Sequence, residues 1–259
     1  MKVKSLLGGA LALALCTGAQ AVEKADLIVL HGRIITMDAK DRVVQAIAVT
    51  GGRIIATGSD KQIVALATAG TQVIDLDGRT ATPGLIDTQV PVSGGAVDRS
   101  VEQVEADILR QFETLHAKGI TAVRDPHVTA QGWEAYRAVL TADGLTERVC
   151  AVTDVQDAPP SLGDGRLIGC GARLDEAKGR RASSSRDILR SRTRLAAPLL
   201  HIEAEAGSLE KGKRADLAVW DRDPYKTAPD RLADMKCLMT LLDGEVIYRT
   251  EQAPVVSKR

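Results

Sequence analysis

Apolar and polar residues alternate over short stretches at both ends of the chain, and this pattern predicts β-strands. Between residues 25 and 86, apolar runs such as ADLIVL, AIAVT and RIIATG are separated by tight turns, among them Gly51-Gly52, a two-residue hairpin signal. Residues 207–249 have the same character, and Asp243-Gly244 is a favoured pair for the type I′ turn of a hairpin. We therefore expect one sheet domain assembled from both ends of the chain, with the middle inserted.

The middle of the chain, residues 88–201, alternates helical spacing with apolar runs. Ser100 and Gln103 predict the start of a helix by a capping box, and Gly119 predicts its end. Apolar positions recur between them at helical spacing: Val104, Ile108, Leu109, Phe112 and Leu115. The strand ITAV, a second helix, the strand RVCAV and a weaker strand from Ile168 to Leu174 follow, and this alternation predicts a parallel sheet.

Two shorter segments complete the pattern. Ser59 and Gln62 form a capping box for a short helix that extends to Ala67. The stretch Arg180–Arg194 is rich in Ser and Arg, and we expect it to be a solvated connection, with an anion site as the alternative.

Residues 1–21 have the layout of a secretory signal. Lys2 and Lys4 precede an apolar run, and Ala19-Gln20-Ala21 is a small-x-small cleavage site. The run is too short for a permanent membrane helix, and a lipoprotein anchor at Cys16 is the alternative to cleavage after Ala21. We expect a secreted or periplasmic protein.

Composition excludes some partners. The 259 residues carry 34 basic and 34 acidic side chains, so the net charge of zero does not favour nucleic acid or anionic membranes. Aromatic residues make up 2% of the chain, which argues against a stacking platform for bases. Once the signal is removed, Cys150, Cys170 and Cys237 remain, and we expect three buried apolar thiols with at most one disulfide.

Acidic residues follow the apolar strands of the middle region. Asp87, Asp125 and Asp154 each end such a strand, so parallel pairing would place them at one mouth, where carboxylates can bind a cation or act as general bases. His127 follows Asp125 at the same end of its strand, where the active sites of α/β barrels gather. Capping of helices and turns is the structural alternative for these residues.

The other histidines are expected to have structural roles. His31 lies at a sheet turn, and His201 is expected in a terminal helix. His116 lies near a helix C-terminus, where a cation suits the helix dipole. The catalytic residues are therefore unknown beyond Asp87, Asp125, His127 and Asp154.

Both ends of the chain resemble the amidohydrolase superfamily. ADLIVLHGRIITMD with TPGLID, residues 82–87, is similar to the family's opening arm. GSLEKGKRADLAVWDRDP, residues 207–224, and LMTLLDGEVIYR, residues 238–249, are similar to its closing segment and final hairpin. In the middle, GITAVRDP, RVCAVTDV and GDGRLIGCGARL resemble amidohydrolase family 3.

The resemblance implies a metal-dependent hydrolase, but two ligand positions depart from it. The family has His-x-His after TPGLID, which would place two imidazoles on one face of a strand to bind zinc or another divalent ion. This chain has Gln89, Val90 and Pro91 there. Arg173 stands where related enzymes have a lysine that forms a metal-bridging carbamate, which a guanidinium does not form. We therefore expect no metal or other cofactor in this chain.

Length restricts the implied fold. A complete (β/α)₈ barrel takes ~250 residues, so Thr88–His201 is enough for roughly three and a half βα units. We expect an α/β protein in which a composite β-sandwich, residues 22–86 and 207–249, joins an incomplete TIM-type barrel, residues 87–206, with about half its strands. Residues 1–21 are the signal and residues 250–259 a tail.

By resemblance, the function is hydrolysis of non-peptide carbon–nitrogen bonds, impaired in this chain by the lost ligands. The alternatives are a non-catalytic exported binding or interaction module and an internally deleted product without activity. We expect a small amide-like molecule as a ligand, no nucleic acid, no membrane span, and self-association through the exposed strand edges of a half barrel.

Overall fold

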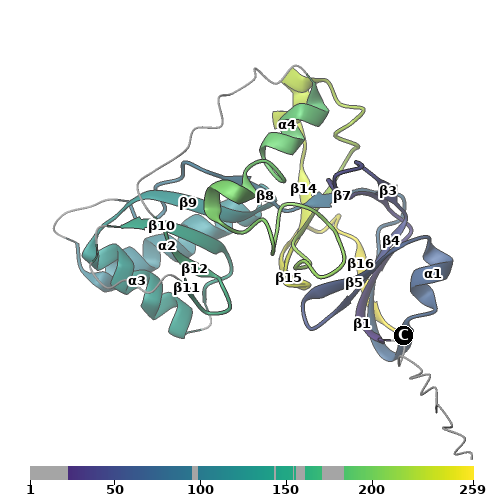
Figure 1. The fold of residues 1–259 in the computed structure, drawn as a ribbon, viewed down its shortest axis with the longest axis horizontal. Helices are drawn as coiled ribbons and strands as arrows, with labels where there is room; N and C mark the ends of the chain where they lie inside the picture. Colours follow the sequence, from purple (N-terminus) through teal and green to yellow (C-terminus); the bar gives the residue numbers. More distant parts are fainter. Residues whose placement is uncertain (1–22, 95–98, 143, 154, 156–160, 171–183) are drawn as a thin grey trace, which may run out of the picture.

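The computed structural model describes residues 23–94, 99–142, 144–153, 155, 161–170 and 184–259. The expected signal sequence, Asp154 and Arg173 lie outside these residues. Figure 1 shows a sheet with two helices on the left of the view and a pair of sheets on the right. The fold is mixed α/β with several sheets.

One sheet of the pair combines strands from both ends of the chain. Its order is β16-β6-β1-β4-β5, with bounds Val255–Lys258, Ala67–Asp75, Ala25–Leu30, Ala46–Thr50 and Arg53–Gly58. The predicted hairpin at Gly51-Gly52 is confirmed, because it joins the antiparallel strands β4 and β5. Residues 250–259, expected as a tail beyond the sandwich, instead supply β16, because the free edge of β6 pairs with it antiparallel.

The second sheet also draws on both ends. Its order is β15-β14-β13-β7-β2-β3, with bounds Glu245–Arg249, Cys237–Leu242, Leu217–Trp220, Thr80–Pro83, Arg33–Ile35 and Val43–Val44. The predicted hairpin at Asp243-Gly244 joins β14 and β15, and both turn residues have the positive φ of a type I′ turn. The two sheets share one apolar core, to which Val29, Ile47 and Ile74 contribute from one side and Leu217, Met239 and Leu241 from the other.

The short helix α1 (Asp60–Val64) covers the outer face of the first sheet. Ser59 caps it with the predicted capping box to Gln62, and Ile63 is buried against the sheet. The helix ends sooner than predicted, since Ala67 already belongs to β6, which pairs with β1.

The third sheet has four parallel strands in chain order. The order is β11-β12-β10-β9-β8, with bounds Ser161–Leu162, Leu167–Cys170, Arg148–Thr153, Ile120–Val128 and Leu85–Asp87. Only β11 runs antiparallel to its neighbour. The predicted parallel sheet is confirmed.

Helices α2 (Val101–His116) and α3 (Ala130–Thr141) cover one face of this parallel sheet (Figure 1). The predicted capping box of Ser100 and Gln103 starts α2, and four of its five predicted apolar positions are buried. Leu109 is the exception, with 44% exposure. No helix among the described residues is both long and apolar enough to cross a membrane.

The opposite face of the parallel sheet is covered by residues 196–206. This segment contains the 3-10 helix Ala197–Leu200, and its apolar side chains pack on Ile86, Ala122 and Cys150. Before it lies α4 (Ser185–Ser191), so the expectation of a purely solvated connection up to Arg194 is wrong for its described part. The helix forms because Ser184 caps it and Leu189 is buried against Ile35 and Met37 of the sandwich.

A disulfide joins two adjacent strands of the parallel sheet. Cys150 on β10 and Cys170 on β12 are bonded, with their Cα atoms 5.6 Å apart. The expectation of three free buried thiols is therefore wrong, because adjacent parallel strands bring these two cysteines together. Cys237 is free and buried.

Candidate functional site

Residues 82–87, the TPGLID segment, carry the chain from the sandwich into the parallel sheet. β7 ends at Pro83 and β8 begins at Leu85, so Gly84 alone separates the two sheets. A Cβ on Gly84 would lie 2.1 Å from Oγ1 of Thr121 on β9. The glycine is needed because β8 packs too closely on β9 to leave space for a side chain.

The positions at which the family resemblance expects imidazoles are exposed. Gln89 and Pro91 follow β8 on the surface, so neither side chain faces a site that encloses an ion. The half-buried carboxylate of Asp87 accepts a hydrogen bond from the backbone N–H of Gln89 at 3.2 Å, and its Oδ2 lies 3.8 Å from Nη1 of Arg192. Asp87 therefore supports a turn and a loose ion pair.

Asp125, by contrast, is fully buried and has several donors. Its Oδ2 accepts hydrogen bonds from the backbone N–H and the hydroxyl of Ser93, both at 2.7 Å, and from the hydroxyl of Tyr136 at 2.9 Å. Burial and the charge of Asp125 raise the pKa of Tyr136 well above its usual value, so the phenol stays a donor. This arrangement fastens the loop after β8 to α3.

The structure does not gather the predicted mouth residues into one constellation. Asp87 and Asp125 have separate partners, and His127 is exposed, with only its backbone N–H directed to Asp125 at 3.5 Å. Asp154 lies outside the described residues. Among the residues that the structure describes, no three His, Cys, Asp or Glu side chains lie close enough together to hold a metal ion.

The residues present therefore do not fit the zinc ion that the family implies. Gln89 offers a neutral amide oxygen and Pro91 offers no side-chain ligand atom, while Oδ2 of Asp125 already accepts from three protein donors. We derive no catalytic step through a metal at this position.

Two histidines have structural contacts. His31, at the turn between β1 and β2, pairs through Nδ1 with Oδ2 of Asp75 at 2.9 Å, and the pair is about half exposed. This hydrogen bond raises the pKa of His31. His201 follows the 3-10 helix in the left-handed conformation, with φ of 58°, instead of lying within a terminal helix.

The expectation of a cationic His116 is wrong. The ring is buried, and this burial lowers the pKa of His116 to about 4. Its Nε2 lies 2.8 Å from Oε2 of Glu147, which is also buried. Burial, together with the charge of Asp216, raises the pKa of Glu147 well above its usual value. Among the described residues, Nε2 of His116 and both carboxyl oxygens of Glu147 lack a hydrogen-bond partner, and burial favours the neutral form of each group.

The densest cluster of charges, which the sequence analysis did not find, joins the parallel sheet to the sandwich. Arg148 at the start of β10 donates from Nε to Asp216 at 2.8 Å and from Nη2 to Asp216 at 3.0 Å, and it also contacts Asp243. Asp243 also pairs with Arg166 at 3.0 Å and with Arg214 at 3.4 Å. Burial alone would lower the pKa of Arg148, but the carboxylates raise it overall.

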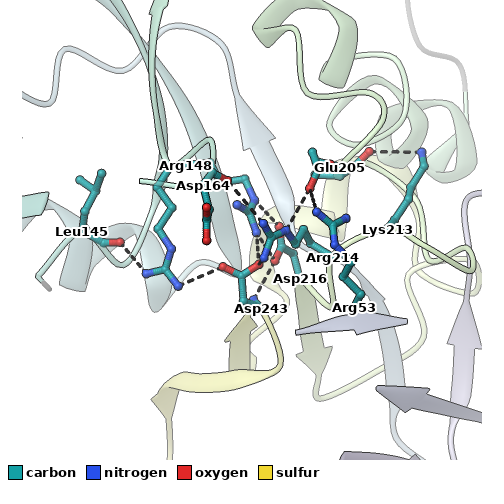
Figure 2. A network of polar contacts seen from close by, with 11 residues as sticks. Arg53, Leu145, Arg148, Asp164, Glu205, Lys213, Arg214, Asp216 and Asp243 are labelled. Carbon is teal, nitrogen blue, oxygen red and sulfur yellow. Dashed lines mark hydrogen bonds and ion pairs between the residues drawn. The ribbon is translucent and has the colours of Figure 1, made fainter. Parts of the chain in front are cut away.

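Figure 2 shows how this cluster continues outward. Arg214 donates to Glu205 at 2.9 Å, and Arg53 of the sandwich donates to the same carboxylate oxygen at 2.9 Å. The cluster thus ties β5, β10 and the hairpin turn at Asp243 into one junction. Its saturated pairs indicate a structural role, and only the turn signal at Asp243-Gly244 was visible in the sequence.

Comparisons with known proteins match parts of this chain to the amidohydrolase family. Residues 171–248 match a model described as the amidohydrolase family. Over 71 residues the chain is 34% identical to an N-substituted formamide deformylase of Arthrobacter pascens. The matched segment covers 27% of this chain and 13% of the deformylase. These matched parts of the chain are similar to the amidohydrolase family.

The chain is also 26% identical over 207 residues to an adenine deaminase of Cereibacter sphaeroides, and the match covers 65% of this chain and 33% of the deaminase. It thus spans a third or less of the length of these two relatives. The solved structure of atrazine chlorohydrolase TrzN from Arthrobacter aurescens TC1, complexed with zinc, is similar in fold, with a TM-score of 0.61 and 15% identity over 88% of this chain and 96% of that one.

Proposed function

We propose that this amidohydrolase chain is a hydrolase by descent, of the class that acts on non-peptide carbon–nitrogen bonds, and that its own catalysis is impaired. The names of two relatives, a formamide deformylase and an adenine deaminase, support the bond class. The observation that carries the impairment is the exposure of Gln89 and Pro91 at the positions of the two expected imidazoles.

The incomplete barrel is part of this proposal. The parallel strands β8, β9, β10 and β12 follow one another in chain order, as the first half of a (β/α)₈ barrel would. Their face opposite to α2 and α3 packs against Leu200, Ile202 and the buried residues Ala196, Ala197 and Ala206. Apolar side chains therefore lie on the side where a complete barrel would continue with further strands.

An assay on the full chain tests the proposal. The purified protein is incubated with zinc and offered N-substituted formamides and adenine, with and without a chelator. We expect no hydrolysis that the chelator removes. Turnover of a formamide or of adenine that the chelator abolishes would contradict the impairment while supporting the bond class.

The second candidate is a non-catalytic exported module that binds a small amide-like molecule or a second copy of the chain. The disulfide between Cys150 and Cys170 supports export, because disulfides persist in oxidising compartments such as the periplasm. Mass spectrometry of the protein from a secreting host tests this. A mature N-terminus at Val22 is expected, whereas retention of residues 1–21 would contradict it.

An internally deleted product without activity is the third candidate, and genomic DNA separates it from the other two. Barrel-coding sequence recovered between the codons for Arg173 and Arg194 would favour the deletion. Its absence from the genome would favour a chain encoded as it stands.

A further inference from the structure

A cleft of about 680 Å³ opens at the end of the parallel sheet away from the predicted mouth. Leu85 begins β8, and Ala117 and Lys118 lie three and two residues before β9 begins, so these lining residues mark the N-terminal ends of the strands. Active sites of α/β barrels lie at the C-terminal ends instead. The cleft is therefore separate from the position at which the family binds its metal.

The walls of this cleft are mainly apolar. The sandwich contributes Trp220, Cys237 and Tyr248, while α4 contributes Ile188 and Leu189. The 3-10 helix η2 (Pro229–Asp234) and the residue that follows it close the other side with Leu232 and Met235. The volume is within the range of pockets for small organic molecules, about 300–1,000 Å³, and such pockets are lined mostly by apolar side chains with a few polar groups.

The charged residues of the lining are all cationic. Lys118, Arg192 and Lys236 line the cleft, and no Asp or Glu is among its described lining residues. Within the described part of the chain, neither Lys118 nor Lys236 forms an ion pair, and both are exposed. Arg192 has only the distant carboxylate of Asp87, at 3.8 Å. This asymmetry contrasts with the junction of Figure 2, where each of the labelled cations has an acidic or backbone partner.

Nearby acidic groups have partners other than the two lysine ammonium groups. Asp221 accepts from the backbone N–H of Lys236 through Oδ1 at 3.0 Å and pairs with Arg222 through Oδ2 at 2.7 Å. Asp234 at the end of η2 pairs with Arg231 at 2.6 Å. The two lysine charges are thus left for a ligand.

We propose that this cleft binds an organic anion with an apolar body, in which the acid group meets Lys118 and Lys236 and the body lies against Trp220, Leu232 and Met235. An anionic head offsets the two free charges, and an apolar body removes the exposed parts of the half-buried Leu232 and Met235 from water. The proposal does not depend on hydrolytic activity, since its residues are separate from Asp87, Gln89 and Pro91.

Calorimetric titration of the full chain with decanoate and with decanol tests the charge requirement, because these probes share an alkyl body and differ in the head group. We expect decanoate to bind more tightly. The double variant Lys118→Ala, Lys236→Ala should weaken decanoate binding by about tenfold and leave decanol unchanged, as expected for two solvent-exposed charge contacts. The matched control Lys40→Ala, Lys61→Ala removes two exposed lysines elsewhere and should change neither affinity.

Met235→Glu tests the location independently, because it places a carboxylate on the cleft wall. We expect it to reduce decanoate affinity more strongly than decanol affinity, with an unchanged circular dichroism spectrum. Absence of decanoate binding, equal affinities for the two probes, or a decanoate affinity that neither variant alters would overturn the proposal.

Discussion

Arg148 and Asp216 form a buried two-point ion pair, with Nε to Oδ2 at 2.8 Å and Nη2 to Oδ1 at 3.0 Å, that connects β10 of the parallel sheet to the residue before β13 of the sandwich. The backbone carbonyl of Asp216 also accepts from Gly84, the glycine between β7 and β8. The ion pair and the sheet crossing thus meet at one residue, which makes this junction the place where the two regions depend on each other.

Replacing Arg148 by Met should therefore destabilise the whole chain. The change leaves Asp216 and Asp243 without their buried cation, and breaking such a pair costs about 3–5 kcal/mol. Urea unfolding followed by circular dichroism measures the loss. As a control, Arg137→Ala removes an exposed pair with Glu134 on α3 and should cost less than about 1 kcal/mol. Equal effects of the two variants would show that the junction is not the stronger contact.

The buried residues His116 and Glu147 are predicted to change the folding stability in opposite directions as the pH changes. The pKa of His116 is about 4 in the fold against 6.5 for a free imidazole, so the unfolded chain takes up a proton first as the pH falls. The contribution of His116 to the free energy of unfolding is complete above pH 6.5 and falls by about 3 kcal/mol towards pH 4. The difference in unfolding free energy between Glu147→Gln and the double variant Glu147→Gln, His116→Gln over this pH range isolates the contribution of His116. A difference that does not change with pH would contradict a buried, neutral His116 ring.

Glu147 should act in the opposite direction. The pKa of Glu147 is raised in the fold, so its stabilising contribution is complete below its unfolded pKa and is lost as the pH rises. Glu147→Gln places a neutral side chain of similar size beside His116 and should stabilise the protein, relative to the wild type, increasingly between pH 5 and pH 8. Thermal unfolding of both proteins at several pH values measures this difference in stability. A stabilisation relative to the wild type that shrinks as the pH rises would refute the prediction.

Reduction of the disulfide should weaken the parallel sheet. The bond between Cys150 and Cys170 closes a loop with a sequence separation of 20, and loops of this size are stabilised by about 3 kcal/mol. Urea unfolding with and without dithiothreitol measures the effect. The variant Cys150→Ala, Cys170→Ala should not respond to dithiothreitol, and an equal response in both proteins would show that the reductant acts elsewhere.

Self-association through the edge of the parallel sheet is a further prediction. β11 ends this sheet with two residues, and Ser161 on it is exposed. Light scattering should find a dimer or larger species, and Ser161→Lys should shift it towards the monomer, because a charge at a strand edge opposes pairing. Ser257→Lys on the sandwich edge strand β16 is the matched control and should have no effect. A monodisperse wild-type monomer would contradict the prediction.

The sequence predicted the elements whose signal is local. Capping residues and helical spacing placed α2, and turn pairs placed two hairpins, because each signal lies within a few residues of the element that it specifies. The helix α4 was missed because its composition is that of a solvated segment. Its stability depends on Leu189, which packs on Ile35 and Met37 from a distant part of the chain.

The features that the sequence did not predict depend on contacts between residues that are far apart in the chain. Arg148 and Asp216 are 68 residues apart, and nothing near either residue indicates the pairing. Cys150 and Cys170 become neighbours only when β10 and β12 pair in parallel. Asp125 was expected to end its strand but lies within β9, and the hydrogen bonds that it accepts from Ser93 and Tyr136 depend on how the loop after β8 packs on α3.

The central proposal is that this chain lacks a competent metal site, and bound zinc tests it most directly. The purified full chain is incubated with excess zinc, passed through gel filtration and analysed by inductively coupled plasma mass spectrometry. We predict a zinc content far below one ion per chain, unchanged in the variant Asp87→Asn. A content close to one ion per chain that a chelator removes would contradict the account.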